Sequence, residues 1–257
     1  NDLMDYSDFR TAVAKNDVKK VCIIGGGLIG CEYTNDLING GFAVEAVDPL
    51  GYCLPTLLPE AAGKAVQAAL EAKGARFHFG PLVAAVNKAA DGVSVTLNNG
   101  DAISADIVVS AVGVRPRIDL AQASGISTNR GIITDRFLQT SAPNVYAMGD
   151  CAEVDGNGLV YVAPLRAAAK ALGKTLAGEP TEVSYPAMPV TIKTPAYPVL
   201  VSPPAHGAQG EWTIEQDGNN VKGLFHDSAG NLLGFALTGE AIKEKMALQK
   251  QLPPIMA

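Results

Sequence analysis

A glycine-rich turn between an apolar strand and a helix constrains the fold of this chain more than any other feature. Residues 21–30 read VCIIGGGLIG, which places Gly25, Gly27 and Gly30 in the spacing GxGxxG. In such a turn the first glycine lets the chain reverse sharply, the second lets the backbone approach a pyrophosphate, and the third lets the helix pack closely on the strand. The spacing therefore predicts a parallel α/β unit that binds a dinucleotide.

The residues on both sides of the turn agree with this prediction. Residues 20–24 form a short apolar run that is typical of a strand, and the apolar positions 28, 29, 33, 37 and 38 follow a helical stripe. Leu28 and Ile29 open this helix, whose N-terminus offers unpaired N–H groups and the positive end of a dipole to a phosphate. A glycine-rich turn of an α/β sheet that binds no ligand is the alternative.

A carboxylate follows at the position that a ribose ligand needs. Residues 43–47 form a second apolar strand that leads to Asp48, 18 positions after Gly30. An acidic residue at about this distance binds the hydroxyls of the adenosine ribose in dinucleotide-binding units. Because no Lys or Arg follows Asp48 closely, we expect NADH rather than NADPH.

Composition excludes several other classes of protein. The 257 residues are 47% hydrophobic and 18% charged, which allows a sizeable core. The formal net charge of −6 argues against nucleic-acid binding, and the chain has no apolar run of 18 residues and no secretory signal, so we expect no membrane insertion. The four cysteines lack a CxxC spacing, and we interpret them as reduced core thiols of a cytoplasmic protein, with two disulfides as the alternative. The three histidines are scattered and predict no metal site.

Patterning divides the chain into three parts: 1–117, 118–178 and 179–257. The first contains a short helix at 7–14, the glycine turn, a helix at 59–73 and an inserted antiparallel meander at 83–103, and it ends in an apolar run at 107–112 that predicts a strand buried on both faces. The second predicts strands at 131–134 and 145–148 and a helix at 163–177. The third is rich in proline and predicts five strands and a final amphipathic helix over about 240–252.

Three motifs, in this order, resemble those of the FAD-dependent pyridine-nucleotide oxidoreductases, the flavoproteins with two dinucleotide-binding domains. The first is the glycine turn extended to Glu32, and the second is SAVGVRP at 110–116, which is similar to the exit from the NAD domain and contains Gly113. The third is Thr140 with YAMGD at 146–150, which is similar to the second FAD motif. The resemblance covers essentially the whole chain. Within the family, the strand end at residues 47–49 (VDP) and residues 188–195 (MPVTIKTP) are most similar to the rubredoxin–NAD reductases.

The resemblance implies roles for several residues. Asp150 would bind the ribitol or pyrophosphate region of FAD, with Gly149 allowing close approach. Val162 and Ala163, at the start of the 163–177 helix, would contact the flavin edge on which negative charge develops during reduction. The remaining implied contacts are Glu32 near the nicotinamide, often paired with a lysine in the family, Gly113 beside the adenine, and Lys193 as a flavin neighbour. For Lys193 a solvated surface role is the alternative.

The implied protein is an α/β flavoenzyme with a Rossmann-like NAD-binding domain, a partial FAD-binding domain and a C-terminal α+β module. It would take a hydride from NADH onto FAD and pass electrons to a small carrier protein such as rubredoxin, with no side-chain nucleophile. Lys243, Lys245 and Lys250 could attract an acidic acceptor, or form a solvated face. Because the family begins with another FAD-binding glycine motif, we expect that this N-terminal segment is missing here. An NADH oxidase, a nitrite-reductase-type module, a disulfide reductase and an NADH-binding fragment without turnover are the alternatives.

Overall fold

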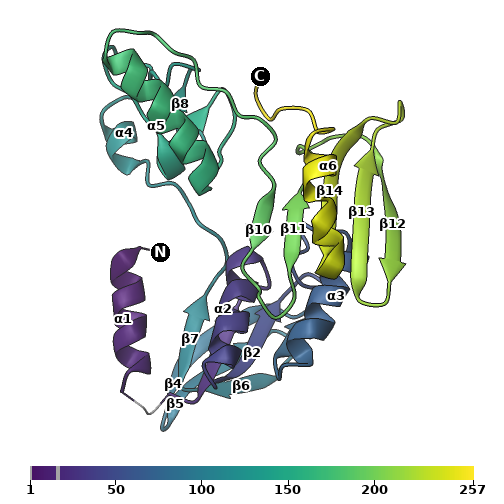
Figure 1. Cartoon of the computed structure of the whole chain (residues 1–257). Helices are drawn as coiled ribbons and strands as arrows, with labels where there is room; N and C mark the ends of the chain where they lie inside the picture. Colours follow the sequence, from purple (N-terminus) through teal and green to yellow (C-terminus); the bar gives the residue numbers. More distant parts are fainter. Residues whose placement is uncertain (1, 16–17) are drawn as a thin grey trace. The chain divides into compact units, whose positions relative to one another are not determined.

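The computed structural model describes residues 2–15 and 18–257 (Figure 1). The chain divides into two compact units, one of Asn1–Gly113 with Pro189–Leu252 and one of Val114–Met188 with Pro253–Ala257. The sheets contain both parallel and antiparallel strands, as the mixed α/β class predicted from the sequence requires. Each unit has its own buried core.

A parallel sheet with strand order β3-β2-β1-β7 forms the base of the first unit. Its strands are β1 (Lys20–Ile24), β2 (Ala43–Asp48), β3 (Arg76–Phe79) and β7 (Ile107–Ser110). In the centre of the sheet, Val21, Cys22 and Ile23 of β1 are fully buried because β2 and β7 pair with β1 on either side. The alternating side chains of β1 therefore face two different apolar layers.

One layer consists of helices. α2 (Leu28–Asn39) begins after Gly27 and ends at Gly40, close to the predicted 28–38, and α3 (Glu60–Glu71) begins after Pro59 and lies within the predicted 59–73. An additional N-terminal helix, α1 (Leu3–Val13), is longer than predicted because Asp2 caps its first turn. Its Phe9 packs edge-on against Tyr33 of α2.

The other layer is the predicted antiparallel meander, which consists of β4 (Val83–Ala89), β5 (Gly92–Leu97) and β6 (Ala102–Ala105). Val95, Leu97 and Ile103 of the meander bury Cys22 and Val47 of the parallel sheet. The position of this insertion could be predicted from the sequence because turn residues interrupt its apolar runs.

The predicted burial of the last parallel strand is wrong. β7 stops at Ser110, its residues are half-buried or exposed, and Val112 is 71% exposed. β7 pairs only with β1 and is an edge strand in the described sheet, so one side of its backbone has no neighbouring strand. A continuous apolar run is therefore not enough to predict a central position.

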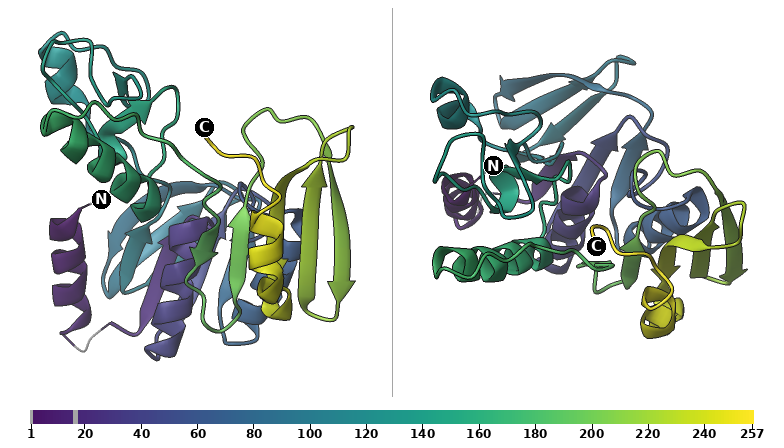
Figure 2. Two further views of the ribbon diagram at one scale, coloured as in Figure 1. Left: turned by 45° about the horizontal axis from the view of Figure 1, so that its top comes forward. Right: turned by 90° about the horizontal axis from the view of Figure 1, so that it is seen from above.

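An antiparallel sheet with strand order β10-β11-β14-β13-β12 completes the first unit. Its strands are β10 (Val190–Ile192), β11 (Val199–Ser202), β12 (Glu211–Asp217), β13 (Asn220–His226) and β14 (Leu232–Thr238). Figure 2 shows α2 and α3 between this sheet and the parallel one, and Val66 and Leu70 of α3 share a buried cluster with Val199, Val201 and Val221. The two helices thus pack against both sheets.

The predicted final helix is two shorter elements. A 3₁₀ helix, η2 (Gly239–Glu244), precedes a short α-helix, α6 (Lys245–Gln249). Ile242 and Leu248 both pack on the cluster around Phe235. They are six positions apart in the sequence, and 3.6 residues per turn would set them on different sides of one α-helix. The tighter 3₁₀ turns resolve this conflict.

The second unit contains the parallel pair β8 (Ile132–Thr134) and β9 (Ala152–Val154), the helices α4 (Asp119–Ala123) and α5 (Val162–Leu176), and the turn η1 (Gly149–Cys151). The strand predicted at 145–148 is wrong, because Tyr146 makes only a single bridge, to Gln139. A turn with Asn144 at φ 61° lies just before it and η1 follows, so the extended stretch is too short for a ladder.

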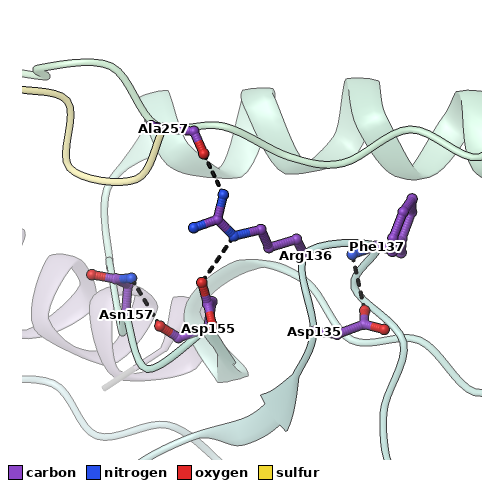
Figure 3. A network of polar contacts seen from close by, with 6 residues as sticks. All are labelled: Asp135, Arg136, Phe137, Asp155, Asn157 and Ala257. Atoms are coloured by element: carbon purple, nitrogen blue, oxygen red, sulfur yellow. Dashed lines mark hydrogen bonds and ion pairs between the residues drawn. The ribbon is translucent and has the colours of Figure 1, made fainter.

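The last residues of the chain complete the core of the second unit. Met256 is 4% exposed, packs with Leu138, and exchanges two backbone hydrogen bonds with Tyr185. Arg136 donates to the carbonyl oxygen of Ala257 and, through Nε at 2.9 Å, to Asp155 (Figure 3). The segment 253–257 therefore packs across this unit and stabilises it.

Candidate functional site

The glycine turn lies at the carboxyl end of β1, and two of its glycines are required by the packing of the protein itself. Gly25 has φ 113°, and a Cβ added there would lie 2.5 Å from the carbonyl oxygen of Ala111. A Cβ on Gly30 would lie 1.9 Å from the carbonyl oxygen of Gly25. Any side chain at either position would push strand, helix and exit loop apart.

Gly27 is different. Its φ of −76° suits any residue, and an added Cβ would meet no protein atom within 4 Å. Nothing in the protein's own packing requires a glycine here. The open space in front of Gly27 is where the sequence predicts the pyrophosphate.

Four backbone N–H groups at the start of α2 have no partner within the described part of the protein. The amides of residues 27–30 have no hydrogen bond to any described residue, and the first bond of α2 runs from Cys31 N–H to the Gly27 carbonyl at 2.9 Å. The first turn of α2 contains no acidic residue. Free amides at the positive end of a helix dipole form an anion-binding site.

Asp48 holds the turn in place. Its Oδ2 accepts from the Gly26 N–H at 2.6 Å, and its Oδ1 accepts from the Leu50 N–H at 2.8 Å. A carboxylate has about four acceptor positions, so Asp48 can still accept from ribose hydroxyls. Phe79, at the end of β3, is the neighbour of Asp48 in the parallel sheet, and a Cβ added to Gly26 would lie 3.3 Å from its ring and 3.2 Å from Asp48 Cβ.

The exit loop of the parallel sheet lies next to the turn. The Ala111 N–H donates to the Ile24 carbonyl at 2.7 Å, and this bond brings the loop that contains Gly113 next to the glycine turn. Gly113 has φ 104° and open space in front of it. The structure therefore brings together Gly25, Gly27, Gly30, Asp48 and the Gly113 loop.

Two buried thiols lie beneath the turn. The Cys31 thiol donates to the Gly26 carbonyl at 3.3 Å, and the Leu54 N–H donates to the same oxygen at 2.8 Å. A hydrogen bond with Cys31, together with burial, holds the pKa of the Cys53 thiol far above its ordinary value. Cys53 therefore stays neutral and does not repel an anion at the turn.

Glu32 and Lys193 meet, although not as an ion pair of side chains. The Glu32 carboxylate accepts from the backbone N–H of Lys193 at 2.8 Å. The Lys193 side chain is exposed. Glu32 thus ties α2 to the loop that follows β10.

The FAD residues implied by the resemblance form a separate group in the second unit. Gly149 has φ 83°, and a Cβ there would lie 3.2 Å from Leu165 Cδ1 of α5. Asp150 is exposed beside it, and the first turn of α5 has neither a side-chain cap nor an acidic residue. Val162 and Ala163 at this helix start are exposed. An exposed carboxylate and an uncapped helix N-terminus fit a polar cofactor.

Sequence reasoning missed three residues near these sites. Asn35 of α2 is 1% exposed and accepts from the Ala196 N–H at 3.2 Å. A polar residue within an apolar helical stripe was the available signal for Asn35. For Phe79 the signal was an aromatic residue at the end of a strand. Leu54, at φ 59°, gave no signal.

No group of three or more His, Cys, Asp or Glu among the described residues could hold a metal ion. Within the same residues, no helix has the length and apolar character that crossing a membrane demands.

Two family models match the chain. Residues 2–171 match pyridine nucleotide-disulphide oxidoreductase, and residues 182–252 match the rubredoxin binding C-terminal domain.

Curated relatives match over the whole chain. It is 59% identical to the rubredoxin-NAD(+) reductase of Alcanivorax borkumensis and 44% identical to that of Acinetobacter baylyi, of which it covers 67% and 66%. The chain thus spans about two thirds of the length of these relatives.

Among solved structures, the putidaredoxin reductase of a covalent complex with putidaredoxin superposes with a TM-score of 0.83 over 98% of this chain and 63% of that one, at 19% identity. This likeness shows the fold alone. The family model over residues 2–171 and the relatives in sequence lead to one conclusion: the chain belongs to the pyridine nucleotide-disulphide oxidoreductase family.

Proposed function

We propose that this chain binds NADH and the electron acceptor in a flavoprotein reductase that takes a hydride from NADH and passes electrons to a small redox protein such as rubredoxin. The observation that carries the proposal is the set of four amides at residues 27–30, unpaired among the described residues, together with the open space at Gly27. The match of residues 182–252 to a rubredoxin binding domain supports the choice of acceptor.

In this proposal the residues of the first unit bind the nucleotide. The amides of Leu28, Ile29 and Gly30 donate to the pyrophosphate, and Asp48 accepts from the ribose while it fixes the turn. The same carboxylate would lie near a 2′-phosphate, which disfavours NADPH because two negative charges would approach each other. Gly113 leaves room for the adenine.

In the second unit, Asp150 and the start of α5 at Val162 and Ala163 would hold part of FAD, with Gly149 giving close access. FAD, when bound, supplies the conversion of a two-electron hydride into single electrons. The uncapped amides at the start of α5 would stabilise negative charge on a flavin bound beside them. Lys193 and Glu32 are proposed as neighbours of the flavin and the nicotinamide.

The proposed organisation is an NAD segment at 1–117, a FAD segment at 118–178 and a C-terminal module at 179–257. We further propose a cytoplasmic location, which suits the four free thiols.

The experiment uses the protein loaded with its flavin, in the absence of oxygen. NADH should bleach the flavin and then reduce rubredoxin, with two rubredoxins reduced per NADH oxidised. Flavin bleaching by NADH without rubredoxin reduction would remove the acceptor and leave an oxidase or a nitrite-type module, which oxygen and nitrite then distinguish. Absence of both steps would leave only the NADH-binding fragment.

A further inference from the structure

Leu54, in the loop between β2 and α3, has a backbone conformation that is uncommon for its side chain. Its φ is 59°, in the left-handed region that residues other than glycine seldom occupy. Pro55 follows directly, and the residue before a proline prefers an extended backbone. Strained residues of this kind persist only where the surrounding structure holds them, and they concentrate at functional sites. The conformation of Leu54 therefore points to a contact that requires it.

That contact is a hydrogen bond to the glycine turn. The Leu54 N–H donates to the Gly26 carbonyl at 2.8 Å, and the Cys31 thiol donates to the same oxygen at 3.3 Å. The Gly26 N–H donates in turn to Asp48 Oδ2 at 2.6 Å. Both polar groups of the Gly26 backbone are thus bound by the protein, which fixes the orientation of this residue.

The orientation of the Gly26 carbonyl decides where the Gly27 N–H points. The two groups belong to one planar trans peptide unit, so the N–H lies on the side opposite to the carbonyl oxygen. The carbonyl is turned towards Leu54 and Cys31, which are both fully buried, and the Gly27 N–H is therefore turned away from them. Gly27 has open space in front of it, and its N–H has no partner among the described residues.

The loop that supplies Leu54 is itself held in place. The Leu54 carbonyl accepts from the N–H groups of Leu57 and Leu58 at 3.0 and 2.9 Å. On the side of α3, Gly63 lets the helix pack directly on the loop, because a Cβ added to Gly63 would lie 2.5 Å from the Cys53 carbonyl oxygen. The loop thus lies between α3 and the glycine turn, with backbone contacts to both.

We propose that Leu54 is a positioning residue for the nucleotide: its left-handed backbone aims an N–H at the Gly26 carbonyl and thereby turns the Gly27 N–H towards the pyrophosphate. Cys31 supports the same carbonyl with a weaker donor. The inference rests on the proposed function. It adds two residues that act through the Gly26 carbonyl rather than on the nucleotide itself.

The test uses substitutions that conserve the volume of Leu54 and change its preference for this conformation. Leu54→Ile introduces a β-branch that disfavours a positive φ, whereas Leu54→Met is unbranched at Cβ. Rapid mixing of the flavin-loaded protein with NADH, without oxygen, gives the Kd for NADH and the limiting rate of flavin bleaching. Leu54→Ile should raise the Kd about tenfold, as expected for one weakened hydrogen bond to a phosphate, and leave the limiting rate within about twofold. Leu54→Met should recover most of the wild-type affinity.

Leu70→Ile is the matched control. Leu70 is also fully buried and belongs to the same apolar cluster, but it lies in α3, where φ is ordinary. A general effect of exchanging a buried leucine for isoleucine would appear at both positions. We expect an unchanged NADH Kd in Leu70→Ile.

Competing ligands show which part of the nucleotide is affected. ADP-ribose contains the pyrophosphate and adenosine does not. As competitors of NADH, ADP-ribose should bind more weakly to Leu54→Ile than to the wild type, and adenosine should bind equally to both proteins. A loop that had simply collapsed would weaken both ligands.

Cys31 provides a second variant at the same carbonyl. Cys31→Ala removes the thiol donor and should raise the NADH Kd about threefold, in the range of one weak hydrogen bond. Cys31→Ser keeps a donor and should restore the affinity. If Leu54→Ile does not fold, this pair of variants decides the test.

Three outcomes would overturn the inference while leaving the proposed function in place. The first is wild-type NADH affinity in Leu54→Ile, or in Cys31→Ala where Leu54→Ile does not fold. The second is an equal rise of the Kd in Leu70→Ile, and the third is an equal loss of affinity for ADP-ribose and adenosine. A wild-type protein whose flavin NADH does not bleach would instead refute the proposed function, and this inference with it.

Discussion

Gly27→Ala, in the glycine turn, should weaken NADH binding while leaving the free energy of unfolding almost unchanged. The new methyl group meets no protein atom within 4 Å, and the φ of −76° is ordinary for alanine, so the free energy of unfolding should fall by less than about 1 kcal/mol. The methyl occupies the open space at Gly27, where the account places the pyrophosphate. A phosphate held there loses one charge-assisted hydrogen bond of about 1.5–3 kcal/mol, which raises the NADH Kd about 10- to 150-fold.

Calorimetric titration with NADH, paired with urea unfolding of the same sample, measures both quantities. Gly173→Ala in α5 is the matched control, because its added Cβ also meets open space. It should slightly raise stability and leave the NADH Kd unchanged. Wild-type NADH affinity in Gly27→Ala, or unfolding of that variant, would refute the idea that this glycine serves a ligand.

Three further predictions concern stability. Gly30→Ala should unfold the first unit or lower its free energy of unfolding by more than about 3 kcal/mol, because the new Cβ would lie 1.9 Å from the Gly25 carbonyl oxygen. Urea unfolding measures this change, and a near-native midpoint would contradict it. Met256→Ala should destabilise the second unit by about 2–5 kcal/mol, seen as faster hydrogen exchange of its core amides. Unchanged exchange would contradict the stabilising role of the segment 253–257. Burial works to raise the pKa of the Glu45 carboxyl, but hydrogen bonds from a lysine and a histidine on the neighbouring strands outweigh it and hold that pKa below its ordinary value. Glu45 therefore adds stability above the unfolded-state pKa of about 4.3, which is lost as the pH falls through the lower folded-state pKa. In urea unfolding from pH 7 to 3, Glu45→Gln should lose less of its free energy of unfolding than the wild type does, and equal losses in the two proteins would contradict this.

The glycine corner could be predicted because its constraints are local. The φ of Gly25 and the contact between Gly30 and Gly25 arise within a few residues of sequence, so the GxGxxG spacing fixes strand, turn and helix together. The boundaries of β1 and α2 accordingly fall within a residue of the prediction.

Contacts between distant segments could not be predicted in the same way. The bond from Ala196 to Asn35 joins residues 161 positions apart, and no local pattern records it. The edge position of β7 depends on which strands pair beside it, so its apolar run was misread. The split of the last helix depends on where the cluster around Phe235 lies, which only the folded sheet defines.

The central claim is that NADH binds with its pyrophosphate at the start of α2. Titration of the isotope-labelled protein with NADH, followed by amide NMR, tests it most directly. The account predicts saturable shifts concentrated at Gly27, Leu28, Ile29 and Gly30, with smaller shifts near Asp48. Saturable shifts that leave these amides unchanged, or no saturation at all, would contradict it.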